Sequence, residues 1–336
     1  MYKVSILVPI YSVEQYIERC ARSLFEQTYP NIEFVFVNDC TPDRSVEVLK
    51  EVIEDYPEKK AFVKIINHKK NRGLAAARNT ALEYASGEFV SHVDSDDWLE
   101  NDAIENLVRV QQEKDVDIVS GNAIAHYSDR IEELIERDYM NKNEMVQQTI
   151  QRTNDHVIWR RLIKTALYRD NGVTAVEGIN IGEDHYTLPR LVYYSKSFAK
   201  CDKVVYHYNC LNSNSYMHSS HKGFNFQRYR NDRDSIDFLI DFFTKHNEQD
   251  YVNELYRIKT DFIYKLFFST LKMGDKKAYS ELCLGWKSID NSYKTAEGVS
   301  VYRAGLLSPS HYFLNRVRVF SRVMVKKLFG IRRYNL

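Results

Sequence analysis

The feature that most constrains the fold is the regular alternation of apolar runs with helical segments between residues 3 and 120. The runs are rich in β-branched and aromatic residues, and the segments between them have helical periodicity over roughly ten to fifteen residues. Such alternation is typical of βαβ units, in which parallel strands share one sheet. The predicted strands cover residues 3–10, 34–37, 62–66, 88–93 and 116–120. The sequence therefore predicts an α/β fold with a mixed, mostly parallel sheet flanked by helices.

Polar residues follow four consecutive predicted strands. They are Tyr11, Asp39, residues 71–73 and residues 94–97. In sheets of this kind, ligands bind beyond the carboxyl ends of the strands. Four polar clusters at four strand ends therefore predict a binding site along that edge.

The acidic turn, Asp94-Ser95-Asp96-Asp97, follows the fourth of these strands. Its three carboxylates would repel one another unless a cation or hydrogen-bond donors faced them. A hard divalent cation that already carries phosphate oxygens needs only one or two protein carboxylates. The alternative is a surface turn in which Asp97 caps the next helix. These four residues alone leave both interpretations open.

The usual glycine-rich phosphate loops are missing. No Gly-x-Gly-x-x-Gly follows the first strand, and no Gly-x-x-x-x-Gly-Lys-Ser/Thr occurs. A dinucleotide-binding fold and a P-loop are therefore disfavoured, as is a nucleotidyltransferase, which normally has a glycine-rich basic loop after its first strand. A nucleotide can instead be held by a carboxylate that accepts an N–H of the base and by a metal ion on its phosphates.

Four ordered motifs resemble the family 2 glycosyltransferases with the GT-A fold. They are Pro9-Ile10-Tyr11-Ser12-Val13-Glu14, Val37-Asn38-Asp39-Cys40-Thr41-Pro42-Asp43, Asn71-Arg72-Gly73-Leu74-Ala75-Ala76-Ala77-Arg78-Asn79 and Val93-Asp94-Ser95-Asp96-Asp97. The resemblance implies an inverting, nucleotide-sugar-dependent transferase that requires Mn²⁺ or Mg²⁺. It also implies a catalytic domain over residues 1–222, with a nucleotide-binding half at 1–120 and an acceptor-binding half at 121–222.

The resemblance assigns the base of the nucleotide to the first two motifs. Pro9 and Tyr11 would border the base, Tyr11 by stacking, and Asp39 would accept a uracil-type N–H. Glu14 is expected among the substrate-binding residues. Ser12 replaces a common Asn, which bears on fine specificity because no charge is lost.

The resemblance assigns the phosphates and the metal ion to the third and fourth motifs. Asp96 would be the main metal ligand, and Asp94 would hold the ribose or the metal ion. Ser95 is expected to contact the substrate. Arg78 would lie near the nucleotide or brace the acidic turn.

A second pair of acids, Glu183 and Asp184, stands at a predicted helix start after a glycine-containing loop. Acids favour helix N-termini through the helix dipole, which is one explanation. A carboxylate that takes a proton from an acceptor hydroxyl is the other. The resemblance implies Asp184 as general base and Glu183 as a supporting residue. His207 or His218 could complete the metal shell, although a lone histidine is more often structural.

Several local predictions concern helix boundaries. Ser12 and Gln15 form a capping box, and Thr41 is expected to cap the helix that follows the second strand. Residues 141–168 are predicted to be helical.

Residues 223–336 are predicted to be a helical C-terminal region, with a basic amphipathic helix at 309–329. On that helix Phe313 and Val317 share the apolar face, and Arg318 lies opposite. Such a helix can lie on an anionic membrane surface or pack on the catalytic domain. Residues 299–336 carry eight basic residues and no acid, so residues 1–298 carry 1 − 8 = −7. The mixed charge of the rest of the chain argues against extended nucleic-acid binding.

The remaining signals concern location. The five cysteines form no Cys-x-x-Cys pair, and neither a signal-peptide pattern nor an 18-residue apolar window occurs. We expect a cytoplasmic protein, peripheral at the inner face of the membrane if the C-terminal helix binds there. The predicted reaction moves a sugar from a UDP-sugar to a hydroxyl of a growing cell-surface glycan, with a lipid-linked acceptor as one option. A non-catalytic nucleotide-sugar-binding protein at the membrane is the alternative.

Overall fold

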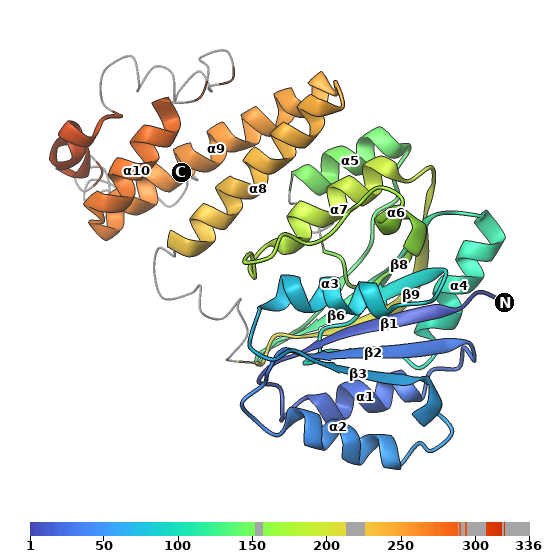
Figure 1. Ribbon diagram of the computed structural model, residues 1–336. Coiled ribbons are helices and arrows are strands. Elements are labelled where there is room, and N and C mark those ends of the chain that lie inside the picture. The colour runs from blue at the N-terminus through green and yellow to red at the C-terminus, as the bar shows by residue number, and fades with distance from the viewer. Residues whose placement is uncertain are drawn as a thin grey trace. The chain divides into compact units, whose positions relative to one another are not determined.

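The computed structural model describes residues 1–151, 157–212, 226–287, 289, 293, 307–317 and 319 (Figure 1). The chain divides into two compact units, Met1–Ser219 and Ser220–Leu336. Each unit has its own buried apolar cluster, and each is described by itself below.

The first unit is built on one mixed sheet with the strand order β3-β2-β1-β4-β8-β6-β9-β5, and β7 pairs with β6. Strands β1 to β4 are mutually parallel, whereas β8 is antiparallel to both β4 and β6. This topology confirms the predicted α/β fold. The strands are β1 (Val4–Ile10), β2 (Ile32–Asn38), β3 (Val63–Asn67), β4 (Phe89–His92), β5 (Trp98–Leu99), β6 (Ile118–His126), β7 (Ile131–Leu134), β8 (Arg161–Lys164) and β9 (Phe198–Asn209).

The register of the parallel strands brings their carboxyl ends together. Ile10, Asn38 and Asn67 are the last residues of β1, β2 and β3, and they pair across the sheet. The segments that follow these strands therefore begin at one edge, as the sequence predicted.

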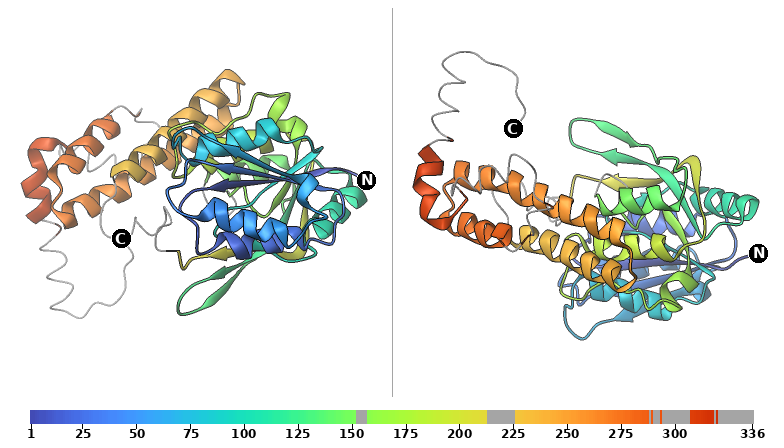
Figure 2. Two further views of the ribbon diagram at one scale, coloured as in Figure 1. Left: turned by 60° about the horizontal axis from the view of Figure 1, so that its bottom comes forward. Right: turned by 90° about the horizontal axis from the view of Figure 1, so that it is seen from above.

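Helices cover both faces of the sheet. Helices α1 and α2 lie on one face of β1–β3, and α3 lies on the other (Figures 1 and 2). The helices are α1 (Ile17–Phe25), α2 (Ser45–Glu54), α3 (Leu74–Tyr84), α4 (Ala103–Lys114), α5 (Lys142–Ile150), α6 (Thr165–Arg169) and α7 (Glu183–Tyr194), with a 3₁₀ turn at Lys60–Phe62.

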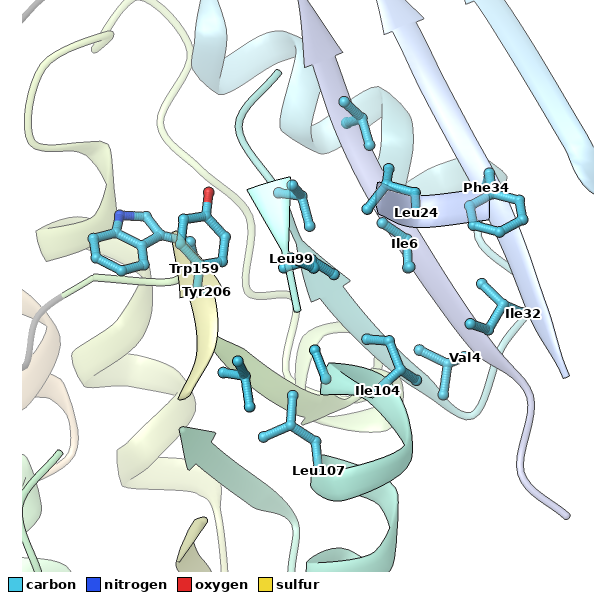
Figure 3. Packing of buried hydrophobic residues seen from close by; sticks show 14 of the residues in the cluster. Val4, Ile6, Leu24, Ile32, Phe34, Leu99, Ile104, Leu107, Trp159 and Tyr206 are labelled. Atoms are coloured by element: carbon cyan, nitrogen blue, oxygen red, sulfur yellow. The ribbon is translucent and has the colours of Figure 1, made fainter. Parts of the chain in front are cut away.

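The core of the first unit lies between the sheet and helices α1 and α4. Val4, Ile6 and Phe34 of the strands pack with Leu24 of α1 and Ile104 of α4, each at most 1% exposed (Figure 3). Burial of such side chains contributes about 1.5–3 kcal/mol each, which fixes the strands that carry the site.

Both predicted helix caps are wrong. Helix α1 begins at Ile17, because Ser12 adopts a left-handed backbone conformation (φ 55°) and its N–H donates to Thr41 Oγ1 at 2.8 Å. Helix α2 begins at Ser45, and Thr41 donates its hydroxyl to Asp43. The two loops after β1 and β2 therefore bond to each other instead of capping helices.

The continuous helix predicted over residues 141–168 is also wrong. Helix α5 ends at Ile150, and residues 161–164 form strand β8, which joins the two halves of the sheet between β4 and β6. A four-residue strand is too short for its periodicity to be distinguished from that of a helix.

The second unit is helical in its described part. Its helices are α8 (Phe226–Lys245), α9 (Gln249–Met273) and α10 (Lys276–Lys287), and a 3₁₀ turn (Pro309–His311) leads into helical residues 312–317. Phe267 of α9 and Trp286 of α10 are almost fully buried in its core, together with Tyr312. The predicted apolar residues beyond 319 lie outside the described residues.

Candidate active site

The loops after β1 and β2 hold the residues predicted to bind the base. Pro9 lies in β1, and Tyr11 follows it with 44% of its surface exposed. Glu14 Oε2 accepts a hydrogen bond from the backbone N–H of Arg44 at 3.1 Å, at the N-terminus of α2. Tyr11 is thus free to meet a ligand, whereas the Glu14 carboxylate already has a structural partner.

Asp39 is buried and ties three segments together. Its Oδ1 accepts from the backbone N–H of Arg72 at 2.8 Å and lies 2.7 Å from Nδ1 of His68. Its Oδ2 accepts from the N–H of Gly73 at 2.6 Å. A carboxylate has about four acceptor positions, so one position on Oδ2 remains for a further N–H donor.

Gly73 is required at the turn that faces Asp39. Its φ of 89° lies in the region that favours glycine. A Cβ at this position would also collide with the side chain of Asn180, in the loop that precedes α7. The N–H of residue 73 reaches Asp39 only because no side chain stands there.

The acidic turn is held by side chains from other elements. Arg78 Nη2 of α3 donates to Asp94 Oδ1 at 3.0 Å, and Asn212 Nδ2 donates to Asp96 Oδ2 at 2.9 Å. Ser95 between them is 5% exposed. Burial and the nearby Asp94 charge raise the pKa of Asp96 to about 6.

Asp97 is not a helix cap, because α4 begins at Ala103 after Asp102. Its carboxylate is fully buried and accepts from the Tyr206 hydroxyl and the Asn209 N–H, both at 2.7 Å. Burial and the Asp96 charge raise the pKa of Asp97 well above its usual range. Asp97 therefore anchors the acidic turn to strand β9.

The carboxylates of the acidic turn fit a divalent cation. Asp94 Oδ2 and Asp96 Oδ1 accept no side-chain hydrogen bond from the described residues. A hard cation that shares its shell with phosphate oxygens needs one or two such oxygens. The described residues contain no cluster of three or more acidic, histidine or cysteine side chains that could bind a metal ion alone.

His207 does not extend this donor set. Its Nε2 lies 2.8 Å from Glu100 Oε1, and its Nδ1 lies 2.9 Å from Nε2 of His126. Its ring also stacks on Trp98 at 4.8 Å. Both nitrogens are engaged, so the geometry favours the structural interpretation, and His218 lies outside the described residues.

Arg78 joins the acidic turn to the base motif, Glu183-Asp184 at the start of α7. Its guanidinium is 5% exposed, and Nη2 lies 3.0 Å from Asp94 Oδ1 and 3.3 Å from Glu183 Oε1. One nitrogen of a buried cation therefore contacts two acidic motifs that lie about ninety residues apart in the sequence.

Burial raises the pKa of both acids of the base motif. Burial and the neighbouring Asp184 charge raise the pKa of Glu183 to about 8, although Arg78 opposes this shift. Burial also raises the pKa of Asp184, and Arg78 again opposes the shift. The N–H of Ile158 donates to Asp184 Oδ2 at 3.2 Å. With a pKa of about 8, Glu183 is mostly protonated at neutral pH.

Sequence reasoning missed the residues of β9 that hold the acidic turn. Tyr206 and Asn209 contact Asp97, and Asn212 contacts Asp96. Nothing local in the sequence pairs that strand with a turn more than a hundred residues earlier, because β9 reaches the turn only through its pairing with β5 and β6.

Comparison with known proteins agrees with this geometry. Residues 5–176 match the profile of "Glycosyl transferase family 2". An uncharacterized glycosyltransferase of Bacillus subtilis, EpsJ, is 35% identical over 188 residues, which cover 54% of this chain and 53% of EpsJ. The glycosyltransferase GlyA of Streptococcus pneumoniae is 43% identical over 120 residues, which cover 36% of this chain and 16% of GlyA. The chain thus spans about half the length of EpsJ and a smaller part of GlyA.

Solved structures show the same fold. The crystal structure of S. aureus TarS 1-349 superposes with a TM-score of 0.63 at 18% identity, covering 99% of this chain and 94% of that one. TarS 1-349 in complex with UDP-GlcNAc superposes with a TM-score of 0.54 at 21% identity, covering 90% and 92% of the two chains. The fold comparison confirms the expected GT-A-like architecture with C-terminal helices. Because the family profile covers more than half of its residues, the chain belongs to glycosyl transferase family 2.

Proposed function

We propose that this protein is an inverting glycosyltransferase that moves a sugar from a UDP-sugar to a hydroxyl of a growing cell-surface glycan. The observation that carries the proposal is the buried contact of Arg78 with both Asp94 and Glu183. The proposed donor site at the acidic turn and the proposed base motif would both be held by this one cation. A reaction that joins a nucleotide-activated group to a hydroxyl needs both parts within one site.

The donor nucleotide would lie along the ends of β1, β2 and β4. Tyr11, which is partly exposed, would stack on the base bordered by Pro9, and the remaining acceptor position of Asp39 would take a ring N–H. Uracil carries such an N–H, whereas the cytosine ring offers none. The TarS complex with UDP-GlcNAc supports a UDP-linked donor in this fold.

The donor diphosphate would face the acidic turn. Asp94 and Asp96 would hold Mn²⁺ or Mg²⁺ through the oxygens that accept no side-chain hydrogen bond. Bound there, the cation offsets the negative charge that develops on the departing diphosphate. Ser95 belongs to the same turn and would contact the substrate, and Arg78 keeps Asp94 in place.

Asp184 would act as the general base. Burial raises the pKa of Asp184, which brings the carboxylate closer to the pH at which a general base works best. It would take the proton of the acceptor hydroxyl as that oxygen attacks the anomeric carbon. Glu183 would stay protonated and support Asp184 through Arg78. A single displacement of this kind inverts the anomeric centre.

The second unit would bind an anionic membrane surface. Phe313 and Val317, on the predicted apolar face, are 67% and 66% exposed, whereas Tyr312 is buried. Apolar side chains beside a basic segment are typical of interfacial helices. Within the described part of the chain, no helix is long and apolar enough to cross a membrane.

A transfer assay tests the proposed function. Purified protein with Mn²⁺, radiolabelled UDP-sugars and a lipid extract of bacterial membranes is expected to give labelled, UDP-dependent product. Asp184→Asn should bind the donor and form no product. Equal loss of donor binding and transfer in Asp184→Asn would contradict the assignment of the base.

A further inference from the structure

A small pocket lies beside the base motif, whose residues Glu183 and Asp184 form part of its lining. It is lined by Arg78 and Leu82 of α3, His92 of β4, Tyr168 of α6 and Asp184 of α7, among others. About 10 Å³ is open to the centre of a water molecule, which is the space of a single water. Its lining includes the polar or charged residues Arg78, His92 and Asp184, whereas dry cavities in protein cores are lined by apolar side chains alone.

Three of the residues that line this pocket carry buried polar atoms without a hydrogen-bond partner. The atoms are Nε and Nη1 of Arg78, Nδ1 of His92 and Oδ1 of Asp184, and none has a partner within the described residues. Buried polar atoms nearly always have a partner, either protein or ordered water. Four such atoms around one space of this size therefore point to a bound ligand with both donors and acceptors.

We propose that this pocket holds a buried water that bridges Arg78, His92 and Asp184 Oδ1, and that His92 and Tyr168 position the base through it. The hydrogen-bond inventory matches one water molecule. Its two O–H groups can donate to Asp184 Oδ1 and His92 Nδ1, and its oxygen can accept from Arg78. A buried water typically makes about three such bonds.

The Tyr168 hydroxyl can accept a hydrogen bond from the form of His92 that this arrangement needs. The Tyr168 hydroxyl lies 3.0 Å from His92 Nε2, and both side chains are buried. A neutral imidazole that donates from Nε2 to Tyr168 presents Nδ1 as an acceptor to the pocket. The orientation of the water is then set from two sides, by the guanidinium of Arg78 and by the ring of His92.

The water would link Arg78 to the carboxylate that it does not touch directly. Arg78 pairs with Asp94 and Glu183, and no ion pair within 4.0 Å joins it to Asp184 among the described residues. Oδ2 of Asp184 is held by Ile158. With Oδ1 held by the water, both oxygens keep fixed positions, which leaves their other lone pairs for the acceptor hydroxyl. This consequence depends on the proposed function, whereas the water itself does not.

Four variants of the full-length protein test the inference. His92→Leu and Tyr168→Phe remove the polar atoms, His92→Asn retains a polar atom near the position of Nδ1, and Leu82→Ala is the control that disturbs the same pocket without removing a polar atom. Loss of a hydrogen bond to a charged group predicts a fall in kcat of about ten- to a hundredfold for His92→Leu. The KM for the donor should change by less than about threefold.

The same assay shows whether the role is positional. His92→Asn should recover most of kcat, Tyr168→Phe should lie between His92→Leu and wild type, and Leu82→Ala should retain kcat despite a lower Tm. Unchanged kcat in both His92→Leu and Tyr168→Phe would overturn the positioning role. So would a fall in kcat for Leu82→Ala equal to that for His92→Leu, because packing alone would then explain the effect.

A crystal structure of the wild-type protein at high resolution tests the site without any activity. We expect ordered water density within hydrogen-bond distance of Asp184 Oδ1 and His92 Nδ1, and its loss in His92→Leu. A dry pocket, or a direct Arg78–Asp184 ion pair that closes it, would overturn the inference. Failure of the wild type to bind or transfer any sugar would count against the proposed function, and the density would still decide the question of the water.

Discussion

The acidic turn and the base motif contain the same residue types but differ in their surroundings. In the acidic turn, Asp94 and Asp96 each have one carboxylate oxygen that accepts no side-chain hydrogen bond from the described residues. Burial raises the pKa of carboxylates in both motifs, to about 6 for Asp96 and to about 8 for Glu183. Different surroundings therefore accompany the metal-binding role that we propose for one motif and the proton-transfer role that we propose for the other.

Arg78 connects the acidic turn with the base motif. It is buried between the two motifs and donates to one acid of each. A single guanidinium thus stabilises two sites with different requirements. Substitutions in the acidic turn, in the base motif and of Arg78 itself should therefore affect UDP binding, sugar transfer and stability in different proportions.

The largest effect is expected from Asp184→Asn. The amide has nearly the same shape but cannot take a proton, so kcat should fall by about 10²- to 10⁴-fold, the usual contribution of a general base. UDP affinity should stay within a few-fold of wild type, because Asp184 lies outside the acidic turn. Steady-state transfer rates and calorimetric UDP binding check both statements. An equal loss of transfer and of UDP binding would mean that the acidic turn and the base motif do not have separate roles.

Arg78→Leu should damage both motifs at once. It leaves Glu183, Asp184 and Asp94 facing one another without their cation, and breaking a buried pair in this way costs about 3–5 kcal/mol. We expect a clear fall in Tm together with loss of UDP binding. Arg78→Lys, the matched control, should recover part of the stability because it restores the charge. An unchanged Tm in Arg78→Leu would show that the stability of the two motifs does not depend on this contact.

Glu183→Gln should have a small effect on transfer at neutral pH. With a pKa of about 8, Glu183 is protonated there, and glutamine resembles the protonated acid. We therefore expect kcat within a few-fold of wild type at pH 7. A loss of transfer as large as that of Asp184→Asn would exchange the roles assigned to the two acids.

The stability of Glu183→Gln should depend on pH in a defined direction. The folded-state pKa of about 8 lies above the ordinary value of 4.5, so the folded protein binds a proton more tightly than the unfolded chain. The contribution of Glu183 to stability therefore falls as pH rises from about 4.5 to 8. The Tm of the variant minus the Tm of the wild type should therefore increase from pH 5 to pH 8.5, which thermal scans at the two pH values can measure. A constant difference would show that the carboxyl is not shifted.

The sequence predicted the parallel half of the fold well, and it predicted that the polar turns after the parallel strands begin at one edge of the sheet. Each of its motifs is local, because a strand and the polar turn that follows it are adjacent in the chain. The strand ends then meet because β1, β2 and β3 pair in register. The roles of Pro9, Tyr11, Glu14 and Asp39 remain predictions. The structure adds that the Glu14 carboxylate already has a backbone partner.

The sequence could not predict how the rest of the site is held. A local role as a helix cap was one of the interpretations open for Asp97, yet its partners Tyr206 and Asn209 come from β9. Strand β8 was hidden inside a predicted helix because four residues carry too little periodicity. The buried position of Arg78 between two motifs likewise depends on how α3 packs against α7. Long-range packing decides these features, and no local pattern encodes it.

The most direct test of the two-part site is calorimetric titration of the purified protein with UDP, GDP and CDP, each with and without Mn²⁺. Wild type and Asp184→Asn should both bind UDP in a Mn²⁺-dependent manner and in preference to the other nucleotides. Asp96→Ala should lose that Mn²⁺-dependent binding, because the acidic turn then keeps only one of the two carboxylates assigned to the cation. No Mn²⁺-dependent binding of any nucleotide to wild type, or equal binding by wild type and Asp96→Ala, would contradict the account.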